Sequence, residues 1–421
     1  MNTFIHQSAV IAPKVSVVLL DWSVRESLHS ITYLNRQTAP REDYELIWIE
    51  YYGRQPEQLR EMAAKDSPLR IDQWIVLNMP EVCYYHKHLM YNIGIALSRG
   101  DIVCICDSDA MFKDTFIDTI ISTFAASDRI VLHLDEVRNN DKRFYPFNYP
   151  SIAEVIGSGA INWQNEKTTG VLDTVDPLHT RNYGACFCAK RDELIGIGGA
   201  DEHIGFVGHI CGPYDMTFRL VNNGCREIWH ETEYIYHTWH PGQAGDQNLL
   251  GPHDGRHVST IALEAAKEGR VMPLKENAAI AALRERTAMS TGADLIDLAV
   301  DASYPDMLVE AKLERIPMFK RWKYLEFIAS LNEQQYNIIR FEDRYYGVPW
   351  SAGELDADKI AAIATRSDVY SGATEAAIRE QVVLNADGPN NPRSTVNQLI
   401  ASGRELFQKV LGWMSRLLFN G

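Results

Sequence analysis

Short apolar runs alternate with helical stretches through the first quarter of the chain, and this alternation limits the fold more than any other feature. The strand-like runs are residues 15–20, 44–49, 74–77 and 102–106, and the helical stretches between them are residues 25–36, 59–65 and 89–98. Such alternation predicts an α/β fold in which helices cover both faces of a mostly parallel sheet. Ligands of such sheets bind at the carboxyl ends of the strands. We therefore expect a site where the run 102–106 ends.

The acidic sequence Asp107-Ser108-Asp109 directly follows that run. Two carboxylates separated by one residue can converge on a hard divalent cation at this point, because the chain leaves the sheet and side chains no longer alternate between its faces. The alternative is an N-cap for a helix at residues 114–124, for which Asp114 is better placed. A metal site at Asp107 and Asp109 is therefore the stronger interpretation.

The net negative charge of the chain limits which kinds of molecule it can bind. With 41 basic and 56 acidic residues the net charge is −15, and 46% of the 421 residues are apolar, as in an ordinary globular protein. A chain this acidic has no general attraction for nucleic acid, so we expect no nucleic-acid partner. An anionic ligand would need a local cation, and a metal ion held by carboxylates would supply one.

Several motifs between residues 13 and 255 occur in a recognisable order. They are VSVVLL from Val15, NRQT from Asn35, DYELIWIE ending at Glu50, YNIGIALSRGDIVCICDSD ending at Asp109, IGIGGADEHIG from Ile195, YDMTFRLVNNG from Tyr214 and YIYHTWHPG from Tyr234. In this order they resemble the family 2 glycosyltransferases, which have the GT-A fold and a DXD metal motif. The resemblance implies transfer of a sugar from a nucleoside diphosphate donor, UDP-linked by expectation, to a glycan or other hydroxyl acceptor. Polysaccharide or glycoconjugate biosynthesis would be the process.

The resemblance also implies roles for single residues. The implied donor contacts are Glu50, Asn92, Asp107 and Asp109. Asp109 with Asp107 would bind the metal, and His237 would complete the shell, with His240 as its rival. Oxygen ligands with one imidazole suit Mn²⁺ or Mg²⁺.

The acceptor side departs from the family pattern. Many inverting members carry a Glu-Asp pair six to seven residues before the arginine of an Arg-Leu dipeptide, but Gly212 and Pro213 stand at those positions before Arg219. The remaining candidates for the base that deprotonates the acceptor are Asp215, Glu202 and Asp201, and the candidate acceptor contacts are Trp239 and Gly199. Asp215 can instead be a first-turn carboxylate that faces a helix dipole.

Two other functions compete with sugar transfer. A degenerate domain that binds nucleotide sugars without turnover would explain the missing acidic pair. A zinc hydrolase would use the dense histidines His230, His237, His240, His253 and His257.

Beyond residue 255 the pattern becomes helical. We predict an N-terminal arm at residues 1–12, the α/β domain at 13–255, a helical domain at 256–384, a linker at 385–395 and a terminal amphipathic helix at 396–421. The helices expected in the helical domain are residues 257–268, 275–289, 293–299, 305–313, 321–342, 357–365 and 373–384. The terminal helix has a basic polar face, so it suits docking on protein or contact with the inner face of a membrane.

The cysteines predict no chemistry of their own. Seven are present, an odd number without a CxxC pair, which indicates free thiols in a reducing compartment. The pairs Cys104/Cys106 and Cys186/Cys188 place both sulfurs on one face of a strand, where small buried apolar side chains are expected. The N-terminus lacks the pattern of a secretion signal, so we expect a cytoplasmic protein.

Overall fold

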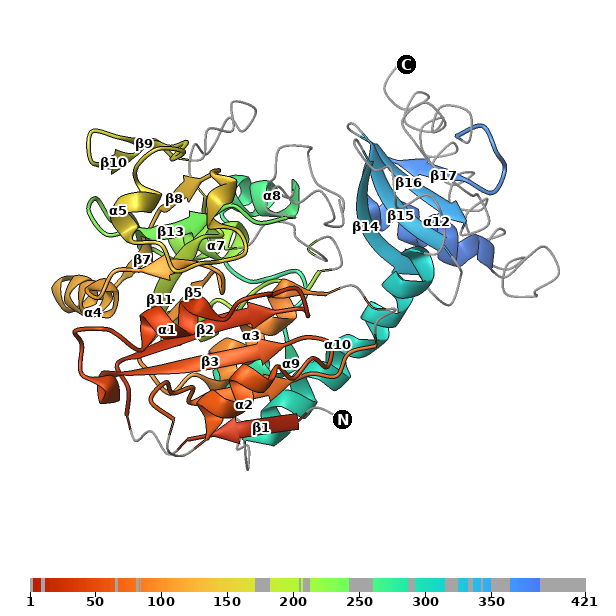
Figure 1. Cartoon of the computed structure of the whole chain (residues 1–421). Coiled ribbons are helices and arrows are strands. Elements are labelled where there is room, and N and C mark those ends of the chain that lie inside the picture. The colour runs from red at the N-terminus through yellow and green to blue at the C-terminus, as the bar shows by residue number, and fades with distance from the viewer. Residues whose placement is uncertain are drawn as a thin grey trace, which may run out of the picture. The chain divides into compact units, whose positions relative to one another are not determined.

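The computed structural model divides the chain into two compact units, one reaching Arg315 with Phe319–Lys323 and the other formed by Ile316–Met318 and Tyr324–Gly421 (Figure 1). The structure describes residues 3–8, 12–64, 67–80, 83, 85–170, 182–203, 206, 213–241, 260–286, 292–314, 325–331, 336–341, 344–349 and 364–386. Each unit is described by itself below.

An eight-stranded sheet forms the centre of the first unit, in the order β1-β4-β3-β2-β5-β11-β7-β12. Its strands are β1 (Thr3–Gln7), β2 (Val15–Asp21), β3 (Tyr44–Glu50), β4 (Gln73–Val76), β5 (Ile102–Cys106), β7 (Ile130–His133), β11 (Cys186–Lys190) and β12 (Arg226–Trp229). Strands β4, β3, β2 and β5 are mutually parallel, as are β7 and β12, whereas β1 and β11 run antiparallel to their neighbours. The predicted α/β fold is therefore confirmed, with the four strands of the opening alternation at its centre.

Helices cover both faces of this sheet. The helices of this unit are α1 (His29–Leu34), α2 (Glu57–Ala63), α3 (Lys87–Leu97), α4 (Phe116–Ala126), α5 (Ile152–Val155), α6 (Arg191–Gly196), α7 (Tyr214–Asn222), α8 (Thr260–Glu268), α9 (Ala278–Arg284) and α10 (Gly292–Glu314), with short 3₁₀ turns at η1 (Arg41–Asp43) and η2 (Lys142–Phe144). Among them α5 packs on a second sheet, which is described below. Every residue of β2 and β3 is buried, and most of them are apolar, as expected for strands covered on both faces.

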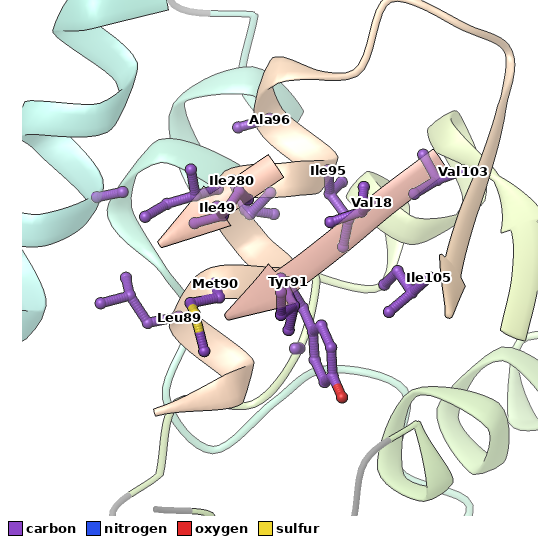
Figure 2. Close-up of a cluster of buried hydrophobic side chains, with 14 of the residues drawn as sticks. Val18, Ile49, Leu89, Met90, Tyr91, Ile95, Ala96, Val103, Ile105 and Ile280 are labelled. Carbon is purple, nitrogen blue, oxygen red and sulfur yellow. The ribbon is translucent and has the colours of Figure 1, made fainter. Parts of the chain in front are cut away.

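Helix α3 packs closely on one face of the sheet. Figure 2 shows Leu89, Met90 and Ile95 of this helix beside Val18 and Ile49 of the sheet, and all five belong to one buried cluster. Helices α1 and α4 contribute to a second buried cluster with the side chains of the opposite sheet face. The site-bearing strand β5 is thus held between two cores.

A second, three-stranded sheet lies in the same unit and carries one of the predicted metal ligands. It consists of β6 (Met111–Phe112), β13 (Ile235–Thr238) and β8 (Glu136–Asn139), with β13 parallel to β8 and antiparallel to β6. A hairpin of β9 (Trp163–Gln164) and β10 (Lys167–Thr168) completes the unit.

The second unit contains an antiparallel sheet and one helix. Its elements are β14 (Leu325–Leu331), β15 (Tyr336–Phe341), β16 (Arg344–Pro349), β17 (Tyr370–Gly372) and α12 (Glu375–Ala386), and Ile338, Ile378 and Val382 form its core. The helix predicted at residues 321–342 is wrong, because that stretch contains β14 and β15. The apolar spacing of this stretch fits the helical and the strand period alike. It forms a strand because YNIIRF (β15) pairs with β16.

The predicted domain limits also differ from the structure. Helices α8, α9 and α10 belong to the first unit rather than to a separate helical domain that starts at residue 256, because α9 and α10 bury apolar side chains in the cluster under α3. The predicted arm at residues 1–12 contains β1, which pairs with β4. Residues 387–421, which include most of the predicted linker and the terminal helix, lie outside the described residues. Among the helices described, none is long and apolar enough to cross a membrane.

Candidate functional site

The Asp107-Ser108-Asp109 tripeptide leaves β5 at the carboxyl edge of the parallel strands, where the sequence places it. Its central residue is the anchor, since the Ser108 hydroxyl donates to the Leu20 carbonyl and the Ser108 carbonyl accepts from Ser30 Oγ at 2.7 Å. Arg25 Nε donates to the same hydroxyl at 2.7 Å. These hydrogen bonds fix Ser108 against β2 and α1, and they leave the carboxylates of Asp107 and Asp109 available to bind a ligand.

Asp109 gathers three nitrogen-bearing side chains around one carboxylate oxygen. Its Oδ2 lies 3.0 Å from His240 Nε2 and 3.5 Å from His237 Nε2, and it also forms an ion pair with the Arg25 guanidinium. Burial alone would raise the pKa of Asp109, but Arg25 and His237 hold it well below its usual range. Burial alone would lower the pKa of His240, but Asp109 raises it.

His237 reaches this cluster from the three-stranded sheet. In β13 it stands opposite Arg138 of β8, and its Nδ1 lies 3.8 Å from Glu136 Oε1. Glu136 is itself held by Arg138 Nη2 at 2.7 Å and by Asn182 Nδ2 at 2.8 Å. The parallel pairing of β8 and β13 therefore positions the imidazole, with a carboxylate behind it.

The donor set at Asp109 fits a divalent cation. One ligand atom each from Asp109, His237 and His240 lies within 4.8 Å of the other two, and the two Nε2 atoms are 3.2 Å apart. One carboxylate oxygen and two imidazole nitrogens suit Mn²⁺ and also Zn²⁺. Asp107 is outside this group, and burial, with Asp109 next to it, raises its pKa to about 6.

A small pocket adjoins the tripeptide. Its polar and aromatic lining includes Trp22, Arg25, Lys87, Tyr91, Asp107 and Ser108. The two cations lie over the Trp22 ring, with Lys87 Nζ 5.0 Å and Arg25 Cζ 5.1 Å from its centroid, and that ring stacks on Tyr85 at 4.4 Å. The pocket lining therefore combines two basic side chains with an acidic one, inside an acidic protein.

Neither Arg25 nor Lys87 is among the site residues that the sequence predicts. Arg25 falls at the start of a stretch predicted as helix, although α1 begins at His29, and Lys87 is at the start of α3. A signal was present, because Arg25 follows β2 by four residues and so belongs to the edge where ligands bind.

Glu50, a predicted donor contact, lies at the end of β3 directly opposite Asp21 at the end of β2. It accepts hydrogen bonds from the backbone N–H of Ser23 at 3.2 Å and of Tyr52 at 3.0 Å. Burial, with Asp21 beside it, raises the pKa of Glu50 to about 7. Glu50 thus braces the loop that carries Trp22 and Arg25.

Asn92 and Gly199, predicted to contact donor and acceptor, lie against each other. Asn92 Oδ1 accepts from the Ala200 N–H at 2.7 Å, and its Nδ2 donates to the Ala200 carbonyl and to Glu202 Oε1, both at 2.9 Å. Gly199 has a φ of +70°, and a Cβ there would lie 2.3 Å from Asn92 Oδ1. These contacts tie α3 to the turn after α6.

The three candidate bases are buried and engaged in the same region. Asp215 Oδ2 accepts from Arg219 Nε at 2.9 Å and from Nη2 at 2.7 Å, and both side chains are fully buried. Asp201 accepts from the N–H groups of Leu274 and Lys275 at 2.8 and 3.0 Å. Glu202 accepts from Asn277 Nδ2 at 2.6 Å, and burial raises its pKa. The role of base stays a prediction for all three.

The remaining predicted site residues do not belong to the Asp109 group as the structure describes it. Trp239, the other predicted acceptor contact, is half-buried beside Lys142, whose Nζ is 4.7 Å from the ring centroid. His230 lies apart from the Asp109 group, with its Nδ1 accepting from the Glu233 N–H at 2.9 Å. His253 and His257 fall outside the described residues.

Comparisons with known proteins give structural similarities only. No protein-family model matches the chain, and no curated protein sequence matches it. One similar solved structure is S. aureus TarS 1–349 in complex with UDP-GlcNAc, with 12% identity and a TM-score of 0.39 over 68% of this chain and 71% of that chain. Another is the mannosyltransferase PcManGT from Pyrobaculum calidifontis in complex with GDP-Man and Mn²⁺, with 13% identity and a TM-score of 0.39 over 76% of this chain and 86% of that chain. Such low values leave the assignment of function to the geometry of the site.

Proposed function

We propose that this protein is a divalent-metal-dependent glycosyltransferase that moves a sugar from a nucleoside diphosphate donor to a hydroxyl acceptor. One observation carries the proposal: Asp109 converges with His237 and His240 beside a pocket lined by Arg25 and Lys87. An oxygen- and nitrogen-rich cation site next to two side-chain cations suits a diphosphate at the carboxyl edge of a parallel sheet. A UDP-linked donor and a glycan acceptor are the expected substrates.

The metal-binding side of the site is assigned to Asp109, His237 and His240, with Asp107 next to them. A bound Mn²⁺ or Mg²⁺ would act as a Lewis acid that offsets the negative charge of the departing diphosphate. Glu136 adds negative charge behind His237, with its Oε1 3.8 Å from His237 Nδ1.

The donor-binding side is assigned to the loop after β2 and to the start of α3. Arg25 and Lys87 attract the diphosphate, and Arg25 can exchange its ion pair with Asp109 for one with a phosphate oxygen. The Trp22 ring supports the two cations, and Tyr85 stacks on it. Glu50 and Asp21 act through the loop they brace, and Trp239 is proposed to stack on the acceptor.

Donor binding in the presence and absence of Mn²⁺ tests the proposal directly. We expect Mn²⁺-dependent thermal stabilisation by a nucleoside diphosphate sugar in the native chain, and its loss in Asp109→Asn and His240→Ala. Asp114→Asn is the matched control, because Asp114 is an exposed acid that follows the same tripeptide by five residues. Unchanged Mn²⁺-dependent binding in Asp109→Asn would refute the metal assignment.

A binding protein without turnover is the second candidate. It is favoured by the engagement of Asp215 with Arg219 and by the absence of the acidic pair at Gly212 and Pro213. A missing base lowers the rate by about 10²–10⁴ and leaves donor affinity intact. Donor binding with no transferred sugar and no released nucleoside diphosphate would select this candidate. Stoichiometric zinc with hydrolase activity and no donor binding would instead select the zinc hydrolase.

A further inference from the structure

Four buried cysteines share one face of the central sheet, in the two adjacent strands β5 and β11. These strands are antiparallel, and their register places Cys106 opposite Cys186 and Cys104 opposite Cys188. All four side chains belong to the core cluster on the α4 side of the sheet. Four of the seven cysteines of the chain therefore occupy neighbouring positions on a single face.

The sulfur atoms are spaced as ligands of one ion are. Cys104 Sγ lies 3.8 Å from Cys186 Sγ along the diagonal of the pairing, and the sulfurs of Cys104, Cys186 and Cys188 all lie within 4.8 Å of one another. A tetrahedral zinc with bonds of about 2.3 Å to sulfur separates its ligands by about 3.8 Å. Three of the sulfurs are therefore near enough to one another to share a cation.

The backbone pairing also makes this arrangement stiff. β5 is hydrogen-bonded to β2 on one side and β11 on the other, and β11 is paired in turn with β7. None of these four cysteines is more than 4% exposed. The thiols are thus presented by preorganised strands rather than by a loop, which favours tight binding.

We propose that Cys104, Cys186 and Cys188 bind one thiophilic d¹⁰ cation, Zn²⁺ or Cu⁺, with Cys106 as the adjacent fourth thiolate. Each ligating thiol gives its proton to solvent and forms a metal–sulfur bond in its place. Soft sulfur ligands select these ions over Mg²⁺ and Mn²⁺. The site is therefore chemically distinct from the Asp109 group.

The position of this thiol cluster gives it a structural effect on the candidate site. Cys106 directly precedes Asp107, so an ion shared by β5 and β11 cross-links the strand that ends in the acidic tripeptide. The four thiols are at most 4% exposed, so the folded core closes over them. Loading should accordingly occur while the chain folds.

Metal content of the full chain tests the proposal. Protein expressed with added Zn²⁺, and in parallel with added Co²⁺, is dialysed against EDTA and measured by elemental analysis and by thiolate-to-metal charge-transfer absorption. We expect about one thiophilic ion per chain that survives EDTA, and elemental analysis distinguishes zinc from copper. Charge-transfer bands report sulfur ligands alone, so the Asp109 group does not contribute.

Single variants assign the ligands. Cys188→Ser should lose at least ten-fold in metal retention, whereas Cys225→Ser, which alters another buried thiol, and Asp109→Asn should retain it. Circular dichroism establishes that each variant is folded, and Cys188→Ala provides a second test if the serine variant is not. A wild-type chain with no EDTA-resistant metal after both loadings would overturn the proposal. A protein mass lower by two hydrogens, the mark of a disulfide, would overturn it as well.

Discussion

Gly199→Ala should strongly destabilise the first unit, because the turn that Gly199 forms leaves no room for a methyl group. A Cβ at this position would lie 2.3 Å from Asn92 Oδ1 and 3.1 Å from Ile280 Cγ1, and the backbone φ is +70°. The left-handed conformation costs an L-residue about 1–2 kcal/mol. Relief of the contact must move the Asn92 amide and lengthen its 2.7 Å bond to the Ala200 N–H.

Loss of that hydrogen bond sets the larger part of the cost. Asn92 is fully buried, and a buried polar group left without a partner costs about 1–3 kcal/mol. With the backbone strain, the substitution should lower the free energy of unfolding by about 2–5 kcal/mol. Gly196→Ala is the control, since no atom lies within 4 Å of its Cβ and it is the last residue of α6. Alanine there should be neutral or stabilising by up to about 1 kcal/mol.

Urea unfolding followed by tryptophan fluorescence measures both variants. The chain has two units, so the comparison uses the midpoint of the transition that the substitution moves. In an Asn92→Ala background the contact is gone, and Gly199→Ala should then cost only the backbone strain of about 1–2 kcal/mol. A cost that is the same in both backgrounds, or below about 1 kcal/mol in the native chain, would refute the packing role of this turn.

Three further outcomes are expected. Arg25→Ala should weaken donor binding by roughly ten-fold. It should strengthen Mn²⁺ binding in the absence of donor, because the Arg25 guanidinium pairs with Asp109 in the native chain. Titration calorimetry measures both affinities, and weaker Mn²⁺ binding by the variant would contradict this reasoning. Glu50 has a pKa raised to about 7 in the folded chain, so the folded state binds the extra proton. The stability of the native chain relative to Glu50→Gln should therefore fall as pH rises from about 4.5 to 7, and a flat difference in unfolding midpoints would argue against this. Asp215→Asn should cost about 3–5 kcal/mol in urea unfolding, because Arg219 stays buried without its counter-charge; a cost near zero would show that the pair is not structural.

The strands at the centre of the fold were predictable because their signal is local. The run 102–106 coincides with β5, and residues 15–20 and 44–49 each miss one terminal residue of β2 and β3. The same reasoning failed for residues 321–342, where one apolar pattern suits a helix or two strands. Only pairing of β15 with β14 and β16 resolves that ambiguity, and pairing is not a local property.

The site residues differ in the same way, since some have a local sequence signal and others depend on contacts between distant parts of the chain. Asp109 is visible in the sequence because it follows a strand, and motif order supplied His237 and His240. The contact between Asn92 and the turn at Gly199 joins positions more than a hundred residues apart, so spacing alone does not reveal it. Arg25 is not among the predicted site residues, because its place in the site depends on the ion pair with Asp109, which only the folded chain forms.

The N-terminal strand β1 forms one edge of the central sheet and covers β4. β1 pairs antiparallel with β4, and the Ser8 carbonyl just beyond it accepts from Arg99 Nη1 at 2.7 Å. Without β1, the backbone donors and acceptors of β4 would be open to another chain as a template for strand addition. A truncation that treats the first twelve residues as a dispensable arm would therefore expose an adhesive edge and promote self-association.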